Sequence, residues 1–211
     1  GIIARLSDLA GIDQIRAQNP AAIQSVADNW LIYALAERDA AAAGDALVAL
    51  GENTFGYDAV GLGQAFGEGL VARMTKDEAK ARSAFTAARA AQEKVVAAQP
   101  NYGPALCVLG LIDAGLGRKE DALQEGRRAI ELLPVEKDFT NGTHMIENFA
   151  VIAAWVGEKD LACEQLALAT RVSSLGSTSY GQLKLLPFWD PLRGDPRFEE
   201  IVASLEPKDT K

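Results

Sequence analysis

The chain has 211 residues, of which 48% are hydrophobic and 24% are charged, and its formal net charge is -8. At about 150 residues per domain, this length predicts one or two domains with a substantial buried core. The excess of acidic residues argues against partners held through phosphate groups, so we expect no direct nucleic-acid partner and no membrane partner. Alanine is frequent and aromatic residues make up only 7%. This composition predicts an all-α protein, because alanine is the best helix former.

The N-terminus and the cysteines give further expectations. The chain starts Gly1-Ile2-Ile3-Ala4-Arg5, without an initiator methionine or the basic start of a secretory signal, which predicts a segment of a longer protein. Cys107 and Cys163 are too few for a disulfide framework, and neither has a C-x-x-C neighbour. The apolar runs are shorter than the roughly 18 residues of a membrane-spanning helix. We expect a cytoplasmic protein without cofactors.

The predicted elements, in chain order, are helices separated by turns. We expect helices over residues 3–18, 21–37, 39–50, 58–74, 77–98, 103–116, 119–132, 143–156 and 159–171. Asn19-Pro20, Gln99-Pro100 and Leu133-Pro134 separate some of them, because the residue before a proline is pushed out of the helical region. Since no segment shows sustained alternation of apolar and polar residues, we expect no β-sheet.

A period of about 40 residues runs through the chain. It is marked by alanines that follow a short charged turn, at spacings of 38, 41 and 40 residues: Ala43, Ala81, Ala122 and Ala162. Positions four and seven residues after each alanine share its helical face. The residues twelve positions before them are mostly small, as expected where a partner helix crosses closely: Leu31, Gly69, Gly110 and Ala150. The pattern predicts a helical hairpin repeated four times.

The third copy resembles the tetratricopeptide (TPR) repeat. Starting from Gly103, positions 4, 7, 8, 20, 27 and 32 of that repeat are occupied by Leu106, Leu109, Gly110, Ala122, Ala129 and Pro134. Asp113 and Gly126 depart from the pattern, since they replace aromatic residues at positions 11 and 24. The resemblance implies a right-handed α-α superhelix, a single solenoid over residues 1–211. Its parts are a partial repeat or N-terminal helix at 1–20, repeats at 24–57, 62–100, 103–140 and 143–173, and a C-terminal cap at 178–206.

The C-terminal part has a different character. Asp195 followed by Pro196 predicts the start of a helix that ends near Leu205. The end of a helical stack needs a cover, and we expect Trp189, Leu192 and Phe198 to supply it. The string Trp-Asp-Pro-Leu-Arg-x-Asp-Pro-Arg-Phe resembles the ends of bacterial multidomain signalling proteins, in which a TPR region follows a kinase, cyclase or winged-helix domain. This resemblance implies a regulatory module of such a protein.

Few residues of the sequence suggest a phosphate-binding, metal or catalytic site. The glycine cluster 61–69 lacks the preceding strand and the Gly-Lys-Ser/Thr sequence of a phosphate loop, so we expect these glycines to pack on a helix. His144 is the one histidine, and with Glu147 it supplies too few ligands for a metal site. We expect His144 to be exposed or to line a groove. No catalytic, cofactor or metal residue is predicted, and the chain is not expected to be an enzyme. A buried cluster of titratable groups around His144 would favour the enzyme alternative.

The TPR resemblance implies a concave groove lined by first-helix positions. These positions and their neighbours are Asp28, Ile32, Phe66, Leu70, Arg73, Cys107, Leu111, His144, Glu147 and Val151. The Lys and Asn with which chaperone-tail binders of the family clamp a terminal carboxylate are missing. The groove therefore predicts a protein partner that offers an apolar or basic peptide segment.

Two alternatives to the peptide groove stay open. The groove can instead be filled by neighbouring segments of the same chain or by a second copy, which would make a homo-oligomer. The module can also sense a small molecule and control an attached kinase, cyclase or DNA-binding domain. A closed apolar pocket at the centre of the groove would favour the small molecule, and an open groove would favour the peptide scaffold.

Overall fold

The computed structural model describes residues 26–57, 59–172 and 178–207, and most of these are helical. The helices are α4 (Ala27–Ala36), α5 (Ala40–Leu50), α6 (Gln64–Met74), α7 (Glu78–Ala98), α8 (Gly103–Gly115), α9 (Lys119–Leu132), α10 (Phe139–Trp155), α11 (Lys159–Val172), α12 (Tyr180–Leu185), the short 3₁₀ helix η1 (Pro187–Leu192) and α13 (Pro196–Ser204). The mostly helical architecture is confirmed. The helix predicted at 3–18, the partial repeat at 1–20 and the start of the helix predicted at 21–37 lie outside the described residues.

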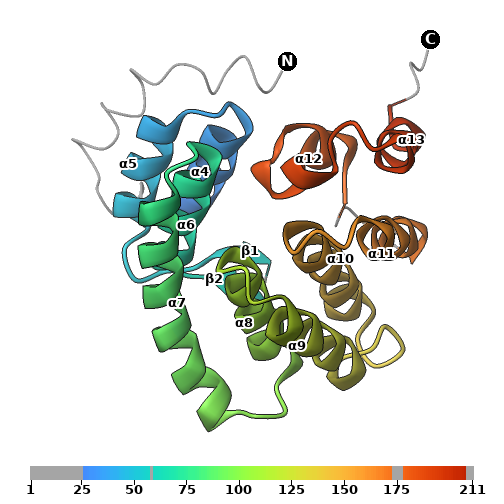
Figure 1. Ribbon diagram of the computed structural model, residues 1–211, viewed down its shortest axis with the longest axis horizontal. Coiled ribbons are helices and arrows are strands. Elements are labelled where there is room, and N and C mark those ends of the chain that lie inside the picture. The colour runs from blue at the N-terminus through green and yellow to red at the C-terminus, as the bar shows by residue number, and fades with distance from the viewer. Residues whose placement is uncertain (1–25, 58, 173–177, 208–211) are drawn as a thin grey trace.

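Consecutive helices pack in four pairs: α4 with α5, α6 with α7, α8 with α9, and α10 with α11 (Figure 1). Each pair turns through one residue with a left-handed backbone, at φ 61° in Arg38 and Lys76, 75° in Gly117 and 85° in Gly157. In all four turns the next backbone N–H donates to the carbonyl five residues before it, over 2.8 or 2.9 Å. The pairs thus share one Schellman-type turn. The four turns recur at the spacing that the alanines show in the sequence.

The small residues of the repeat lie where paired helices cross. All four alanines that mark the period are buried. A β-carbon at Gly110 would lie 3.2 Å from the carbonyl oxygen of Ala122, and one at Gly69 would lie 2.8 Å from the ring of Phe85. Since the distance between helix axes depends on the side chains at the contact, these residues allow close packing. The predicted packing role of the glycines in α6 is confirmed at Gly69.

A β-hairpin replaces the start of the helix predicted at 58–74. Strand β1 (Phe55–Tyr57) pairs antiparallel with strand β2 (Val60–Leu62), and α6 begins only at Gln64. The expectation that the chain holds no sheet is therefore wrong. Each strand has only three residues, so the alternation of buried and exposed positions is too short to stand out in the sequence.

One glycine of the hairpin is required by the backbone. Gly56 has φ 113°, and a β-carbon there would lie 2.6 Å from the carbonyl oxygen of Val60. A side chain is excluded both by this conformation and by the opposite strand. The expectation that the glycine cluster 61–69 follows no strand and packs on a helix is wrong for its first members, because Gly61 belongs to β2 and Gly63 is the N-cap of α6. Gly67 and Gly69 do pack closely within α6.

Helix α10 starts four residues before the predicted start at residue 143. Its N-cap is Asp138, whose carboxylate accepts hydrogen bonds from the backbone N–H of Asn141 (3.0 Å) and from its side-chain amide (2.8 Å). This cap satisfies free N–H groups of the first turn. The loop predicted over 135–142 is correspondingly shorter. Apart from the start of α6, the other described ends of the predicted helices lie within about two residues of the prediction.

The two departures from the TPR pattern have structural counterparts. Asp113 is completely buried, and its carboxylate accepts from Arg89 Nε (2.7 Å) and lies 3.2 Å from Arg118 Nε. At Gly126 a β-carbon would lie 2.5 Å from the ring of Phe149, so the next helical pair fills the space of the missing aromatic residue. An ion pair with a buried carboxylate and a neighbouring phenyl ring therefore lie at the two positions where the TPR resemblance predicts aromatic side chains.

Residues 178–207, here called the C-terminal segment, comprise α12, η1 and α13. They lie between α4 on one side and α10 and α11 on the other (Figure 1). The helix predicted from Pro196 is confirmed as α13, with Asp195 as its N-cap. Trp189, Leu192 and Phe198 are buried, as expected for a cover.

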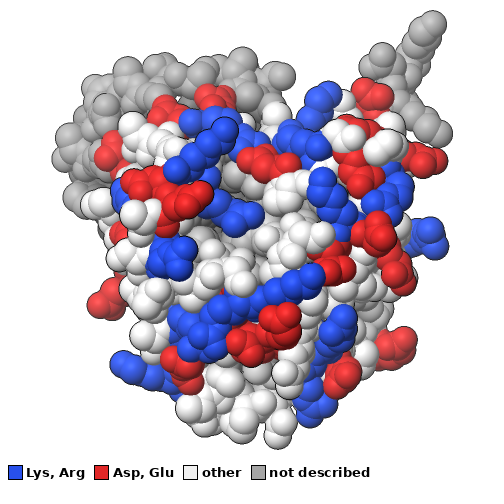
Figure 2. All heavy atoms as spheres, in the orientation of Figure 1, with Lys and Arg blue, Asp and Glu red and all other residues white. Residues whose placement is uncertain are grey.

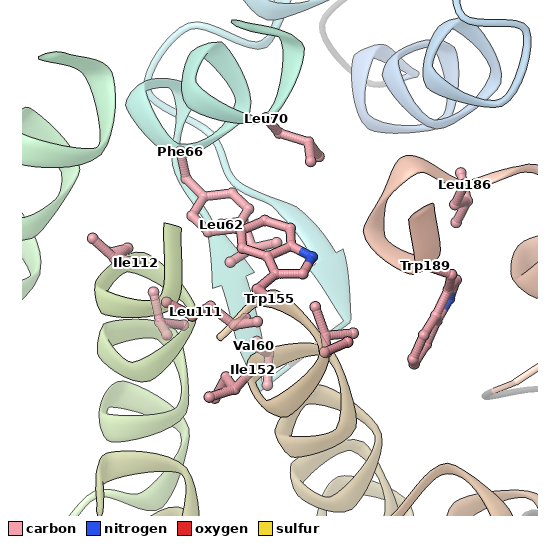
Figure 3. Packing of buried hydrophobic residues seen from close by; sticks show 14 of the residues in the cluster. Val60, Leu62, Phe66, Leu70, Leu111, Ile112, Ile152, Trp155, Leu186 and Trp189 are labelled. Carbon is pink, nitrogen blue, oxygen red and sulfur yellow. The ribbon is translucent and has the colours of Figure 1, made fainter. Parts of the chain in front are cut away.

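The core is centred on Trp155, at the end of α10. Figure 3 shows its indole beside Phe66 and Leu70 of α6 and above Val60 of the hairpin, with Leu186 and Trp189 of the C-terminal segment across from them. The rings of Trp155 and Phe66 lie 6.2 Å apart and nearly parallel. Burial of such aromatic groups is the main contribution to packing stability. One core therefore joins α6, α10 and the hairpin.

Candidate functional site

A pocket of about 250 Å³ lies between α4, the β-hairpin, α10 and the C-terminal segment. Most of its lining is apolar, from Ile32, Phe55, Val60, Leu62, Val151, Leu186, Phe188 and Trp189. The polar side chains that reach it are those of Asp28, Asn29, Tyr57, Glu147, Asn148 and Gln182. An apolar cavity with a few polar groups is typical of small-molecule sites, although this one is slightly smaller than their usual range of about 300–1000 Å³.

Four of the predicted groove residues meet in this pocket. Asp28 and Ile32 come from α4, and Glu147 and Val151 come from α10, one helical turn apart in each case. The spacing predicts this shared face because residues four apart lie on one side of a helix. The walls contributed by the hairpin and by the C-terminal segment were not predicted.

The predicted groove residues of the middle repeats lie elsewhere. Phe66, Leu70, Cys107 and Leu111 are at most 1% exposed and belong to the core, and none of them lines the pocket. Burial raises the pKa of the Cys107 thiol to about 12, so this group stays protonated and unreactive at neutral pH. The continuous concave groove expected from the repeat pattern therefore does not include these residues, because hairpin and helix side chains cover them.

His144 is neither exposed nor part of the pocket lining, contrary to the expectation. It is 6% exposed, and its ring stacks on that of Tyr57 with the centroids 3.9 Å apart. Its Nδ1 lies 3.4 Å from the Glu147 carboxylate. The reason is the hairpin, which places Tyr57 over the first turns of α10. Since the hairpin itself was not foreseen, its cover over His144 could not be foreseen either.

The pocket has a buried acidic side. Glu147 is 6% exposed, and burial raises the pKa of its carboxyl group, an effect that the hydrogen bond and charge of His144 partly oppose. Burial and the nearby Glu147 charge also raise the pKa of Tyr57. The Tyr57 hydroxyl accepts a hydrogen bond from Gln182 Nε2 at 2.9 Å. The C-terminal segment is thereby linked to the hairpin at the edge of the pocket.

Two further contacts hold the C-terminal segment over the pocket. The indole Nε1 of Trp155 donates to the backbone carbonyl of Phe188 at 2.8 Å. The guanidinium of Arg38, in the turn between α4 and α5, donates to both carboxylate oxygens of Asp190. The predicted cover of the last helical pair thus reaches back to the first described pair. No signal in the sequence pairs Arg38 with Asp190, so this closure was missed.

Arg73, the remaining predicted groove residue, borders a second depression. Its guanidinium carbon lies 4.4 Å from the centre of the Trp155 indole, a cation–π arrangement. This groove, about 440 Å³ in volume, is lined by Lys76, Arg82 and Glu78 as well as by Arg73 and apolar residues of α7 and α8. Burial lowers the pKa of Arg73, while the charge of Asp190 raises it. The predicted groove is therefore divided into an acidic pocket and a mainly basic depression.

The described part of the chain shows neither a metal centre nor a membrane span. Within residues 26–57, 59–172 and 178–207, no group of three His, Cys, Asp or Glu side chains is placed to hold a metal ion. In the same part of the chain, no helix combines the length and apolar character needed to cross a bilayer. Figure 2 shows basic and acidic side chains intermingled over the face it presents.

Comparisons with protein-family models, curated proteins and solved structures find no match to this chain.

Proposed function

We propose that the chain is a non-catalytic regulatory module with a TPR-like superhelical arrangement, and that its central pocket binds a small ligand. In this proposal the module belongs to a larger cytoplasmic bacterial signalling protein, whose attached domain responds to the ligand. The observation that carries the proposal is the pocket, which is bounded on one side by α4 and on another by the C-terminal segment. The small-molecule alternative is favoured over a peptide groove because the central space is bounded by four parts of the fold and its lining is mostly apolar.

The position of the pocket gives a physical route from binding to regulation. Its walls belong to the first described helical pair and to the last segment, which contact each other through few residues. A ligand that touches both walls stabilises the closed arrangement by its differential affinity for it. Occupancy would then change how firmly the two ends are held together, and an attached domain can respond to that change.

The pocket also bears on the enzyme alternative. The titratable groups Tyr57, His144 and Glu147 do lie together and are mostly buried. The titratable groups that line the pocket are Asp28, Tyr57 and Glu147. We propose that these groups bind the ligand without transforming it. Mass spectrometry of a bound compound before and after incubation should recover it unchanged.

The proposal can be tested with one neutral probe and two variants. Phenethyl alcohol, a phenyl ring on a short polar arm, should bind saturably in saturation-transfer NMR. Ile32→Trp places a large ring at the half-buried α4 wall and should abolish this binding. Val48→Trp, at a position on α5 that is 71% exposed, is the matched control and should leave it unchanged. Binding that persists in the Ile32 variant would contradict the proposed site.

A protein-interaction function is the second candidate, supported by the depression at Arg73. Three basic side chains face one acidic side chain there, and the indole of Trp155 forms part of the floor. Such a groove fits an acidic peptide segment with an apolar residue. Fluorescence anisotropy should then show binding of a labelled acidic peptide that Arg73→Gln weakens. Equal binding of the Arg73 variant would argue against this surface.

A further inference from the structure

Building on the proposed ligand pocket, we infer that its ligand is a small amine: an ammonium group on an apolar, preferably aromatic, body. The inference rests on the charges, the aromatic lining and the size of the pocket.

The charged side chains of the pocket all have the same sign. Asp28 from α4 and Glu147 from α10 line it, and no Lys, Arg or His is among its described lining residues. Both carboxylates thus reach one space from two different walls. Glu147 is buried and Asp28 is half-buried, so a cationic ligand in this pocket would meet complementary charge from both walls.

The neighbours of the two carboxylates leave room for such a cation. Asp28 accepts a hydrogen bond from the neutral amide of Asn29 at 3.1 Å. Glu147 has His144 beside it, with Nδ1 3.4 Å from the carboxylate, and His144 stacks on Tyr57 outside the pocket lining. Among the described residues, no Lys or Arg forms a salt bridge with either carboxylate. An ammonium group could therefore pair with a pocket carboxylate without displacing a lysine or arginine of the described residues.

The remaining lining matches the body of an aromatic amine. Phe55, Tyr57, Phe188 and Trp189 bring four aromatic side chains to a pocket of about 250 Å³. Aromatic faces attract cations, and aromatic cages are a common way of binding substituted ammonium groups. A volume of this size admits a single ring with a short arm.

Three isosteric probes separate this inference from the proposed pocket itself. Phenethylamine, phenethyl alcohol and phenylacetate have similar shapes and are cationic, neutral and anionic at neutral pH. Isothermal titration calorimetry should give an affinity for phenethylamine about tenfold tighter than that for the alcohol, with phenylacetate weakest. Equal affinities of the amine and the alcohol would overturn the inference and leave the pocket standing. If none of the three binds, the proposed ligand pocket fails as well.

Single substitutions test whether the carboxylates of Glu147 and Asp28 recognise the ammonium group. Glu147→Gln and Asp28→Asn should each reduce the preference for phenethylamine over the alcohol, while the affinity for the alcohol is retained. The retained alcohol binding shows that these variants are folded with an intact pocket. Glu200→Gln, at an exposed position on α13 away from the pocket, is the control and should keep the preference. A preference unchanged in both pocket variants would contradict the inference.

Discussion

Arg38 and Asp190, which lie 152 residues apart in the chain, form a two-pronged ion pair with N–O distances of 2.6 and 2.7 Å. Arg38 is also the left-handed residue of the turn between α4 and α5. The pair therefore connects a repeat turn of the first described helical pair to η1, beside the pocket. Stacked hairpins have no general need for a contact between the first described pair and the C-terminal segment, and this contact holds η1 beside the pocket.

Breaking this pair should loosen the C-terminal segment more than it destabilises the whole chain. Because the two side chains are 38% and 42% exposed, Arg38→Gln should lower the free energy of unfolding by only about 0–1 kcal/mol. Hydrogen exchange of residues 186–193 should nevertheless become faster. Arg128→Gln removes an exposed pair within α9 and is the control. Unchanged exchange in η1 of the Arg38 variant would show that the pair does not hold the segment.

The repeated turn predicts a stabilising substitution. Lys76 has the same left-handed backbone, φ 61°, that Gly157 has in its own turn, and a side chain is unfavourable there. Lys76→Gly should raise the free energy of unfolding in urea by about 0.5–1 kcal/mol. Gly157→Ala should lower it by about 1 kcal/mol although nothing lies within 4 Å of the added carbon. Opposite signs at the two positions are the expected result, and equal signs would contradict the shared turn.

A pair of helical glycines separates the effect of packing on stability from that of helix propensity. Gly126→Ala would bring a methyl group to 2.5 Å from the ring of Phe149 and should cost about 1–3 kcal/mol of stability. Gly44 lies within α5 with nothing within 4 Å, so Gly44→Ala should stabilise by about 0.5–1 kcal/mol. Thermal unfolding of both variants checks this. A stabilised Gly126 variant would mean that α9 and α10 are not as close as described.

Glu125 predicts a pH dependence of stability. Burial, helped by the charge of Asp113, raises the pKa of Glu125 from 4.5 to about 8. Between these values the folded chain binds more protons than the unfolded chain, so this group makes the free energy of unfolding fall as pH rises from about 4.5 to about 8, and then level off.

The matching variants isolate this group. Glu125→Gln should flatten the fall in urea-derived stability over that pH window, because it removes the titrating carboxyl. Glu131→Gln, in the same helix and 64% exposed, should keep the wild-type slope. If the Glu125 variant showed the same slope as the wild type, the buried carboxyl would not be the source.

The sequence pattern predicts what depends on local periodicity. The spacing of Ala43 and its equivalents predicts the helix pairs, and the turns at the same spacing confirm it. In the same way, the Asp195-Pro196 pair predicts α13. Periodicity does not predict the hairpin, because its strands are only three residues long. It does not predict the ion pair between Arg38 and Asp190 either, because a contact between residues far apart in the chain leaves no periodic pattern.

The candidate site likewise has features that helical spacing predicts and features that only long-range packing determines. Asp28 with Ile32 and Glu147 with Val151 are one-turn pairs, and helical spacing suffices to put each pair on one face. The two pairs line one pocket only because the hairpin and the C-terminal segment complete its walls. These parts of the chain are far apart in the sequence. The burial of His144 has the same origin, since Tyr57 covers it from β1.

The most direct test of the central claim, that the pocket between α4, the hairpin, α10 and the C-terminal segment binds a small ligand, is methyl NMR with phenethylamine. The methyl signals of Ile32, Val151 and Leu186, which line the pocket, should shift saturably together. Those of the exposed Val48 and Val95 should stay in place. Shifts that are absent, that do not saturate, or that appear at the exposed methyls instead would contradict the account.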